Sequence, residues 1–336
     1  MTQNKDGTYN YGTALLAGFE WLLHKHPEVF VIGQGLWSPW YVGNSMTDLD
    51  KKFGVERIID TPVSESAVTG AAVGAALAGK KPIVVHPRMD FMLYAMDAIV
   101  NQAAKWRHMI GGQAQVPVTI RGIVNRGGEQ GAQHSQALHS WFAHIPGLRV
   151  VMPTSVADAR DLLIASVLSP DPVVFIDDRW LYAQEDELPD VTTPLDLSKQ
   201  GPKIIRSGDD ITLVAASHAV MLAQEAATML ADRGISAEVV DVRVISPLQS
   251  EVICGSARKT GRVLCVDGGW APCGFSAEIL AVLAENLAPT EWRSSPQRLT
   301  LPYAPAPTSR VLEAAYYPTS EDVVLQVQQM LGGVQS

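Results

Sequence analysis

Two segments of the chain place residues that can transfer protons beside a helix start or a flexible loop. The first, residues 60–66 (DTPVSES), joins a predicted strand to a predicted helix and carries Glu65. Open α/β sheets bind ligands at the carboxyl ends of their strands, and partial burial there would raise the pKa of a carboxyl and suit it to proton transfer. On local sequence alone, Ser64 and Glu65 are better explained as a helix cap and a first-turn acid that complements the helix dipole, because acids are common in first helical turns. The local sequence leaves both interpretations open.

The second segment is a glycine-rich loop at residues 121–136 (RGIVNRGGEQGAQHSQ), which contains His134. Glycines permit unusual backbone angles, and loops often carry function. A lone histidine is more often a surface or capping residue, so the loop alone does not assign His134 a role. Phe91 follows another predicted strand in residues 86–91 (HPRMDF), where an aromatic ring belongs either to the core or to a platform for a flat heterocycle. Arg88 and Asp90 of that run can simply pair with each other.

Several other chemistries are excluded or disfavoured. No two histidines have the spacing of a zinc site, and neither a nucleophile-elbow serine nor a phosphate-binding loop occurs. The run 33–38 (GQGLWS) imitates a dinucleotide fingerprint but lacks its third glycine and is followed by Pro39, so we interpret it as a strand-to-loop turn.

Composition indicates which kinds of partner and which cellular compartment to expect. With 26 basic and 35 acidic residues the net charge is −9, which argues against a nucleic-acid partner. The most apolar run, residues 71–79, is far shorter than the roughly 20 residues that a membrane span needs. A polar start and three cysteines without metal-ligand spacing predict reduced thiols and a cytoplasmic location.

The elements that must position these residues alternate between short apolar strands and helices, and 336 residues correspond to roughly two domains. Such alternation predicts parallel sheets covered on both faces. An acidic, proline-bearing stretch at residues 183–202 predicts a linker. We therefore expect two doubly wound α/β domains in series, at residues 1–182 and 203–336. The predicted strands are 29–32, 57–59, 82–85, 116–120, 148–151, 172–176, 211–216, 237–242 and 262–266, and the predicted helices are 13–24, 67–78, 91–106, 156–168, 219–233, 276–287 and 320–331.

Longer motifs in fixed order carry a family resemblance over nearly the whole chain. They include residues 60–65 (DTPVSE), 95–105 (AMDAIVNQAAK), 131–136 (GAQHSQ), 146–153 (PGLRVVMP) and 235–243 (ISAEVVDVR). Together they resemble the beta subunit of the thiamine-diphosphate-dependent 2-oxo acid dehydrogenases of the pyruvate, branched-chain and acetoin type, in the transketolase-like superfamily. The resemblance implies a transketolase-type pyrimidine-binding domain followed by a transketolase C-terminal-type domain.

The resemblance also implies roles for individual residues. The carboxylate matching Glu65 bonds the aminopyrimidine N1′ of the cofactor and so promotes proton removal from its thiazolium C2, after which the thiazolium accepts the electrons released on decarboxylation. The ring matching Phe91 lies against the pyrimidine. The histidine matching His134 lies near the reacting centre, where it orients or protonates intermediates and acyl acceptor.

A family motif that is absent implies a partner. The diphosphate-and-magnesium motif, Gly-Asp-Gly followed later by asparagine, has no counterpart, and residues 208–210 (GDD) are a poor imitation. The resemblance therefore implies an alpha subunit that holds the diphosphate and magnesium in an α2β2 heterotetramer, with beta–beta contact through the C-terminal domain. It leaves open a structural monovalent cation near residues 166–171 and a lipoyl-bearing acyltransferase as a further partner.

Two departures place the chain in an outlying subgroup. The run that is rich in phenylalanine in familiar members contains His86 and Arg88 here. The loop before His134 usually carries a proline-glycine pair after its arginine, whereas residues 123–129 read IVNRGGE here and include Arg126. His86, Arg88 and Arg126 are therefore candidates for the substrate side, and because burying unpaired charge is costly they favour a polar or anionic substrate such as a sugar. We expect a 2-oxo acid decarboxylase that passes on the acyl unit. The alternatives are a two-subunit transketolase or carboligase acting on an aldehyde or sugar and, less favoured, a non-catalytic scaffold.

Overall fold

The computed structural model of the chain describes residues 7–38 and 40–332, so Pro39 lies outside the described residues. The chain forms two compact units. The first comprises the residues up to Arg126 together with Gln133–Gln200, and the second comprises Gly127–Ala132 together with the residues from Gly201 onward. No helix among the described residues has the length and apolarity needed to cross a membrane.

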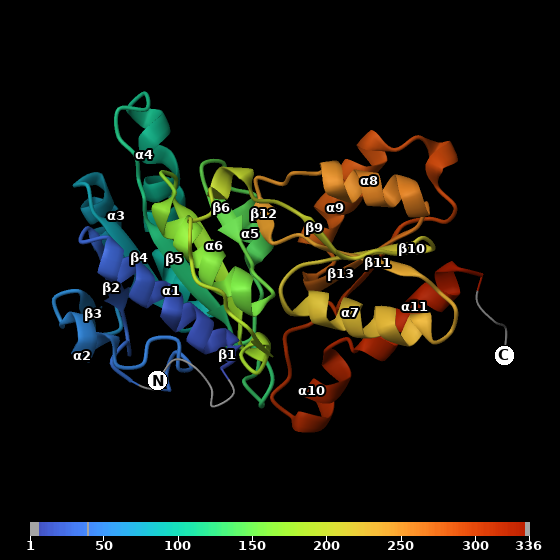
Figure 1. Ribbon diagram of the computed structural model, residues 1–336, viewed down its shortest axis with the longest axis horizontal. Helices are drawn as coiled ribbons and strands as arrows, with labels where there is room; N and C mark the ends of the chain where they lie inside the picture. The colour runs from blue at the N-terminus through green and yellow to red at the C-terminus, as the bar shows by residue number, and fades with distance from the viewer. Residues whose placement is uncertain (1–6, 39, 333–336) are drawn as a thin grey trace. The chain divides into compact units, whose positions relative to one another are not determined.

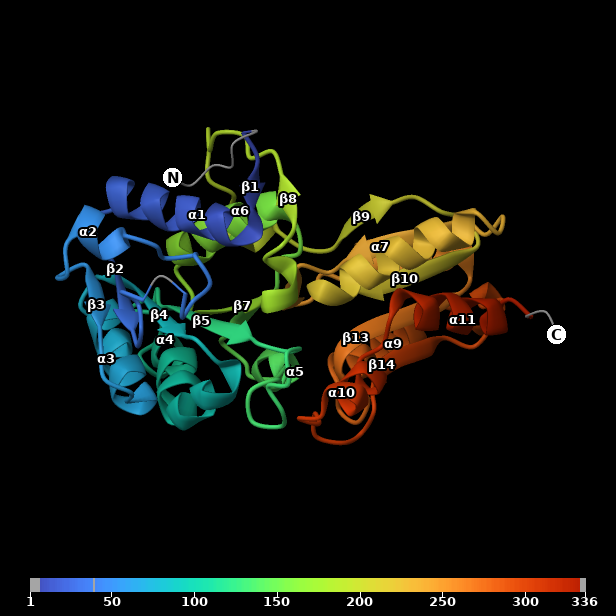
Figure 2. The same cartoon turned by 90° about the horizontal axis from the view of Figure 1, so that it is seen from below.

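The first unit is built on parallel strands in the order β6-β7-β5-β4-β2-β3. Helices α1 (Tyr11–Lys25) and α6 (Val156–Leu168) pack together on one face, and α3 (Glu65–Leu77) lies on the other with the segments that follow β4 (Figure 2). Cover on both faces explains why these strands read as continuous apolar runs. The strands are β2 (Val29–Gly33), β3 (Ile58–Asp60), β4 (Lys81–His86), β5 (Thr119–Val124), β6 (Arg149–Val151) and β7 (Val173–Asp178).

The strand register brings several loops to one edge of this sheet. Gly33 pairs with Asp60 on one side and with Val85 on the other, and Val124 pairs with Asp178. The carboxyl ends of these strands therefore lie at the same edge, where the segments after β2, β3, β4, β5 and β7 begin. This is the edge at which parallel α/β sheets bind ligands.

Two predicted elements of the first unit differ from their predicted form. The helix predicted at 91–106 is a 3₁₀ helix η1 (Met89–Ala95), a π-helical segment η2 (Asp97–Ala103) and helix α4 (Ala104–Met109). Its buried residues Met89, Met92 and Ala95 are spaced by three, which matches a 3₁₀ turn. Strand β5 extends beyond its predicted end because the charged Arg121 is fully buried against a partner in β7.

The segment predicted as a linker belongs largely to the first unit. Strand β8 (Glu185–Asp186) pairs antiparallel with β1 (Tyr9–Asn10), and Gln184 Nε2 donates to the Thr154 carbonyl at 3.2 Å. These bonds attach to the first unit a polar stretch whose composition alone predicted a linker. Four short helices complete the unit, namely α2 (Leu49–Phe53), α5 (His139–Ala143), η3 (Arg179–Leu181) and η4 (Leu197–Lys199).

The second unit has a five-stranded sheet in the order β14-β13-β10-β11-β9, in which only β9 runs antiparallel to its neighbour. Helices α7 (His218–Ala231) and α11 (Ser320–Met330) cover one face, and α8 (Glu251–Thr260) and α9 (Phe275–Asn286) the other (Figure 1). The edge strands were not predicted because their polar residues hide the strand pattern. The remaining elements are β9 (Lys203–Arg206), β10 (Ile211–Ala215), β11 (Ala237–Asp241), β12 (Val244–Ser246), β13 (Val263–Trp270), β14 (Gln297–Leu301) and α10 (Arg310–Tyr316).

Candidate functional site at the carboxyl edge of the first sheet

Glu65 is the first residue of α3 and follows β3 by a short connection. Its side chain is half-buried and forms no hydrogen bond or ion pair with the described residues. Ser64 occupies the cap position, but its side chain makes no capping hydrogen bond. The carboxylate is therefore held at the sheet edge without a protein partner, and it is available to a ligand.

Phe91 and His134 are brought together from different loops. Their ring centroids lie 5.2 Å apart at an interplanar angle of 86°, so the rings meet edge to face. Beside them, Asp90 Oδ1 accepts from the backbone N–H of Gln136 at 3.2 Å and from its side-chain amide at 2.9 Å. These bonds tie the segment after β4 to the segment after β5, and they fix the two rings relative to each other.

Asp90 is a polar residue of this region that sequence analysis did not assign to the site. It is buried, and its Oδ2 has no hydrogen-bond partner. Burial raises the pKa of the Asp90 carboxyl, while its hydrogen bonds to Gln136 oppose the shift. A buried acceptor without a donor beside Phe91 and His134 is the kind of group that a bound ligand satisfies.

His86 was predicted on the substrate side, and the structure places it inside the unit. Only 3 % of its surface is exposed, and its Nε2 shares a 3.2 Å hydrogen bond with Thr69 Oγ1 of α3. Thr69 lies one helical turn beyond Glu65. His86 therefore fastens the helix that carries Glu65 to β4, and it has no route to a substrate.

The buried imidazole predicts a specific pH dependence of stability. Burial lowers the pKa of His86 to about 4 from its ordinary 6.5. Between pH 6.5 and pH 4 the unfolded chain therefore binds a proton at His86, whereas the folded chain does not. The free energy of unfolding therefore falls as the pH drops through this range, by about 3 kcal/mol in all. In His86→Phe, the difference in the free energy of unfolding between pH 7 and pH 4, measured by urea unfolding, should be smaller than in the wild type by this amount. The same substitution at the exposed His108 should leave the pH dependence unchanged, and equal slopes in all three proteins would contradict the assignment.

The two candidate arginines have different surroundings. Arg126 is 7 % exposed; its NH2 lies 2.8 Å from Asp178 Oδ2, and its guanidinium lies over the Trp180 ring at 5.5 Å. This pairing accounts for the charge of Arg126 within the fold. Arg88 is only half-buried at the end of β4, and of the three substrate-side candidates it is the one with surface left for a ligand.

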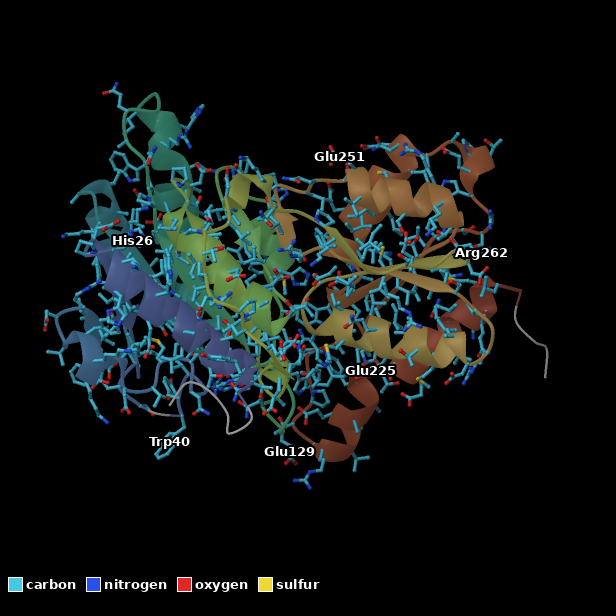
Figure 3. All side chains as sticks on the ribbon, viewed as in Figure 1. His26, Trp40, Glu129, Glu225, Glu251 and Arg262 are labelled. Carbon is cyan, nitrogen blue, oxygen red and sulfur yellow. The ribbon has the colours of Figure 1, made fainter. Side chains whose placement is uncertain are left out.

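The glycine-rich loop is divided between the two units. Within the second unit, the backbone N–H of Glu129 donates to Glu313 Oε2 of α10 at 2.9 Å, and Arg310 NH2 donates to Glu129 Oε2 at 3.2 Å. Figure 3 labels Glu129 at the end of this loop. Glu129 has a positive φ of 64°, and a side chain on Gly131 would meet Thr308 Oγ1 at 2.7 Å. The segment just before His134 is thus anchored on α10, which the sequence did not indicate.

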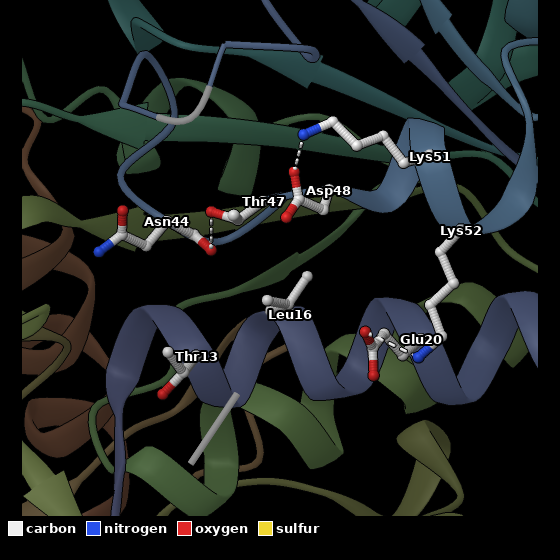
Figure 4. A pocket seen from close by; sticks show the side chains of 8 residues that line it. All are labelled: Thr13, Leu16, Glu20, Asn44, Thr47, Asp48, Lys51 and Lys52. Carbon is white, nitrogen blue, oxygen red and sulfur yellow. Dashed lines mark hydrogen bonds and ion pairs between the residues drawn. The ribbon is translucent and has the colours of Figure 1, made fainter. Parts of the chain in front are cut away.

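A surface pocket of about 440 Å³ in the first unit lies apart from the predicted residues (Figure 4). Its charged side chains are paired with each other, Lys52 with Glu20 at 3.0 Å and Lys51 with Asp48 at 2.5 Å. Because its charges are already neutralised, the pocket offers less to a ligand than the sheet edge does. It is lined by Thr13, Leu16, Glu20, Asn44, Thr47, Asp48, Lys51 and Lys52.

The described residues contain no group of three or more histidine, cysteine, aspartate or glutamate side chains that could hold a metal ion. In the turn at residues 166–171, Asp171 already accepts from Arg149 Nε at 3.0 Å and is also ion-paired with Arg107. A cation at this turn would therefore depend on backbone carbonyl oxygens.

Comparisons with known proteins define the class. Residues 8–184 match the transketolase pyrimidine-binding domain, and residues 202–323 match the transketolase C-terminal domain. A solved structure described as a split gene transketolase, inactive beta4 tetramer, has the same fold with a TM-score of 0.73 and 24% identity over 96% of both chains. The chain is thus an α/β protein with two transketolase-type domains.

More similar relatives define the family. The beta subunit of acetoin:2,6-dichlorophenolindophenol oxidoreductase from Bacillus subtilis is 40% identical over 84% of this chain and 82% of its own. Subunit beta-1 of the mitochondrial pyruvate dehydrogenase E1 component from Arabidopsis thaliana is 39% identical over 93% of this chain and 86% of its own. The chain belongs to the family of beta subunits of the thiamine-diphosphate-dependent 2-oxo acid dehydrogenases. The predicted fold class and family are confirmed.

Proposed function

We propose that this chain is the beta subunit of an α2β2 enzyme that decarboxylates a 2-oxo acid and transfers the acyl unit, and that Glu65 is its cofactor-activating acid. The observation that carries the proposal is the unpartnered, half-buried carboxylate of Glu65 at the carboxyl edge of the pyrimidine-binding unit. Family membership makes the chain part of a thiamine-diphosphate enzyme, and the geometry supports this acid as the group that meets the cofactor.

The residues at the sheet edge fit the aminopyrimidine half of the cofactor. When bound, thiamine diphosphate supplies the nucleophilic carbon and the electron sink for decarboxylation. Glu65 is positioned to share a proton with a ring nitrogen, and Phe91 offers an apolar ring for the pyrimidine to lie against. His134, fixed edge to face on Phe91, is positioned to hold or donate a proton at the substrate. Asp90 Oδ2 remains as a buried acceptor for a donor of the ligand.

The alpha subunit is proposed because the chain lacks the diphosphate-and-magnesium motif and exposes apolar side chains near Glu65. Val63, two residues before Glu65, is 72% exposed; Trp37, after β2, is 48% exposed; and Tyr94, on η1, is 74% exposed. Exposed apolar groups gathered around a ligand edge are typical of a protein interface. We therefore propose that an alpha subunit covers this edge and supplies the diphosphate and magnesium site.

A beta–beta contact is proposed for the second unit. Helix α10 and the segment before it expose Tyr303, Val311 and Leu312 by 60% or more. This apolar surface supports the proposal that the C-terminal domain joins two beta subunits. The three cysteines form no disulfide, which supports the proposed cytoplasmic location.

Co-purification tests the assembly. A tagged form of the full chain, expressed with candidate alpha subunits that carry the Gly-Asp-Gly motif, should retain one of them in a complex of four chains that contains thiamine diphosphate and magnesium. The complex should release carbon dioxide from a 2-oxo acid and depend on lipoamide or a dye as acceptor. Product formation with an aldehyde and no lipoamide would replace acyl transfer by carboligation. A chain that retains no alpha subunit and no cofactor would contradict the proposal.

A further inference from the structure

Arg179 directly follows β7 at the same sheet edge, and its side chain is fixed by neighbouring residues. Its NH2 donates to the Tyr41 carbonyl at 2.9 Å, and its guanidinium lies over the Tyr182 ring at 5.0 Å. A Cβ on Gly43, whose φ is +60°, would lie 1.6 Å from Arg179 NH1. The absence of a side chain at Gly43 therefore makes room for this guanidinium. Its Nε is buried and has no hydrogen-bond partner.

Arg88 follows the end of β4 at the same edge of the sheet as Arg179. Strands β4 and β7 are separated only by β5, so their ends lie about 10 Å apart, and two long side chains can cross that span. Burial lowers the pKa of Arg88, and the nearby charge of Arg179 lowers it further. Tyr41 and Asp90 oppose this shift, so Arg179, Tyr41 and Asp90 each lie within electrostatic reach of Arg88.

The acids around this pair are largely engaged elsewhere. Asp90 is held by Gln136, Asp178 pairs with Arg126, and Asp177 pairs with Arg121. Among the charged groups that act on Arg88, Asp90 is the acid and Arg179 is the second cation, so two guanidiniums lie near one carboxylate. Two guanidiniums brought together in partly buried positions repel each other unless an anion lies between them, and their planar donors suit carboxylate or phosphate oxygens.

We propose that Arg88 and Arg179 form an anion-binding subsite that selects a substrate carrying a second anionic group, a carboxylate or a phosphate, in addition to the reacting 2-oxo acid or carbonyl. The subsite lies beside Asp90, whose neighbours Phe91 and His134 belong to the proposed catalytic region. Only the identity of the ligand as a substrate rests on the proposed function. The anion site itself belongs to this chain.

Two measurements test the subsite. In the co-purified α2β2 complex, dye-linked decarboxylation of 2-oxoglutarate, which has an anionic tail, is compared with that of 2-oxobutanoate, which has an apolar one. Arg179→Gln and Arg88→Gln should each raise the KM for the dianion about ten- to hundredfold, because each removes charge-assisted hydrogen bonds, and should change the KM for the monoanion little. Glyceraldehyde and glyceraldehyde 3-phosphate, offered as acceptors, distinguish a carboxylate from a phosphate specificity.

Direct binding separates this inference from the proposed function. The full chain is titrated with succinate and with inorganic phosphate at constant ionic strength, and one of the two should raise the melting temperature in the wild type but not in Arg179→Gln. Arg233→Gln, an exposed arginine of the second unit, is the matched control. A complex without decarboxylase activity whose chain still binds the anion would refute only the proposed function. Unaltered substrate discrimination and anion binding in both variants, or loss of the alpha subunit on their purification, would overturn the subsite.

Discussion

Glu65→Gln should reduce turnover of the α2β2 complex by at least a hundredfold while leaving the fold intact. The amide keeps the size of the carboxyl but cannot hold and release a proton, and such transfers contribute about 10²–10⁴-fold to rate. Glu65 makes no hydrogen bond or ion pair in the described residues, so no internal partner is lost. The measurement is steady-state turnover, with the thiamine diphosphate content determined in parallel to separate cofactor activation from cofactor binding.

Glu251→Gln is the matched control for this prediction. Glu251, labelled in Figure 3, is the first residue of α8, follows a serine whose side chain makes no capping hydrogen bond, and is exposed. Each substitution removes one negative charge from a helix N-terminus, at a cost of about 0.3–1 kcal/mol. If Glu65 were only a first-turn acid, the two variants would behave alike. Activity within a few-fold of wild type in Glu65→Gln would refute its role.

Local sequence was sufficient to predict the helices and strands that have a regular pattern of apolar residues. Helix α6 has its predicted bounds, β2 is longer than predicted by one residue at its end, and β4 is longer by one residue at each end. Apolar strands between helices can only form a covered parallel sheet, so the fold class followed from the pattern. The family resemblance then named Glu65, Phe91 and His134, and the structure shows that the last two are in contact.

The surroundings of the charged candidates could not be predicted, because their partners are distant in sequence. His86 and Arg126 were assigned to the substrate side because they are charged or polar residues in two segments that depart from the family pattern. Their partners, Thr69 and Asp178, come from other elements, and these contacts bury both side chains. Arg179 was missed, although it lies only three residues after the strand predicted at 172–176. A rule that flags charged residues at every strand's carboxyl end would have found it.

A buried network of charged and polar side chains beneath the sheet edge could not be predicted for the same reason, since its members are also distant in sequence. Arg121 and Asp177 are fully buried, and the guanidinium donates through Nε and NH2 to the two carboxylate oxygens, each at 2.9 Å. NH1 donates to Ser45 Oγ at 2.9 Å, and NH2 donates to the Tyr182 hydroxyl at 2.7 Å. Burial is the largest single influence on the pKa of Arg121 and lowers it, but Asp177, Tyr182 and Tyr11 together outweigh burial and raise the pKa, so the guanidinium stays charged.

Asp177→Asn should therefore lower the free energy of unfolding of the chain by about 3–5 kcal/mol, because it leaves a buried guanidinium without its counter-charge. Glu20→Gln, which breaks the more exposed pair with Lys52, should cost less than about 1 kcal/mol. Urea unfolding of both variants measures the difference, and equal losses would show that burial does not decide the strength of the Arg121 pair. The double variant Arg121→Met/Asp177→Leu should recover much of the stability, since no charge remains buried. The network also holds Tyr182, on whose ring Arg179 lies, so this double variant should still weaken anion binding at Arg179 even where its stability has returned.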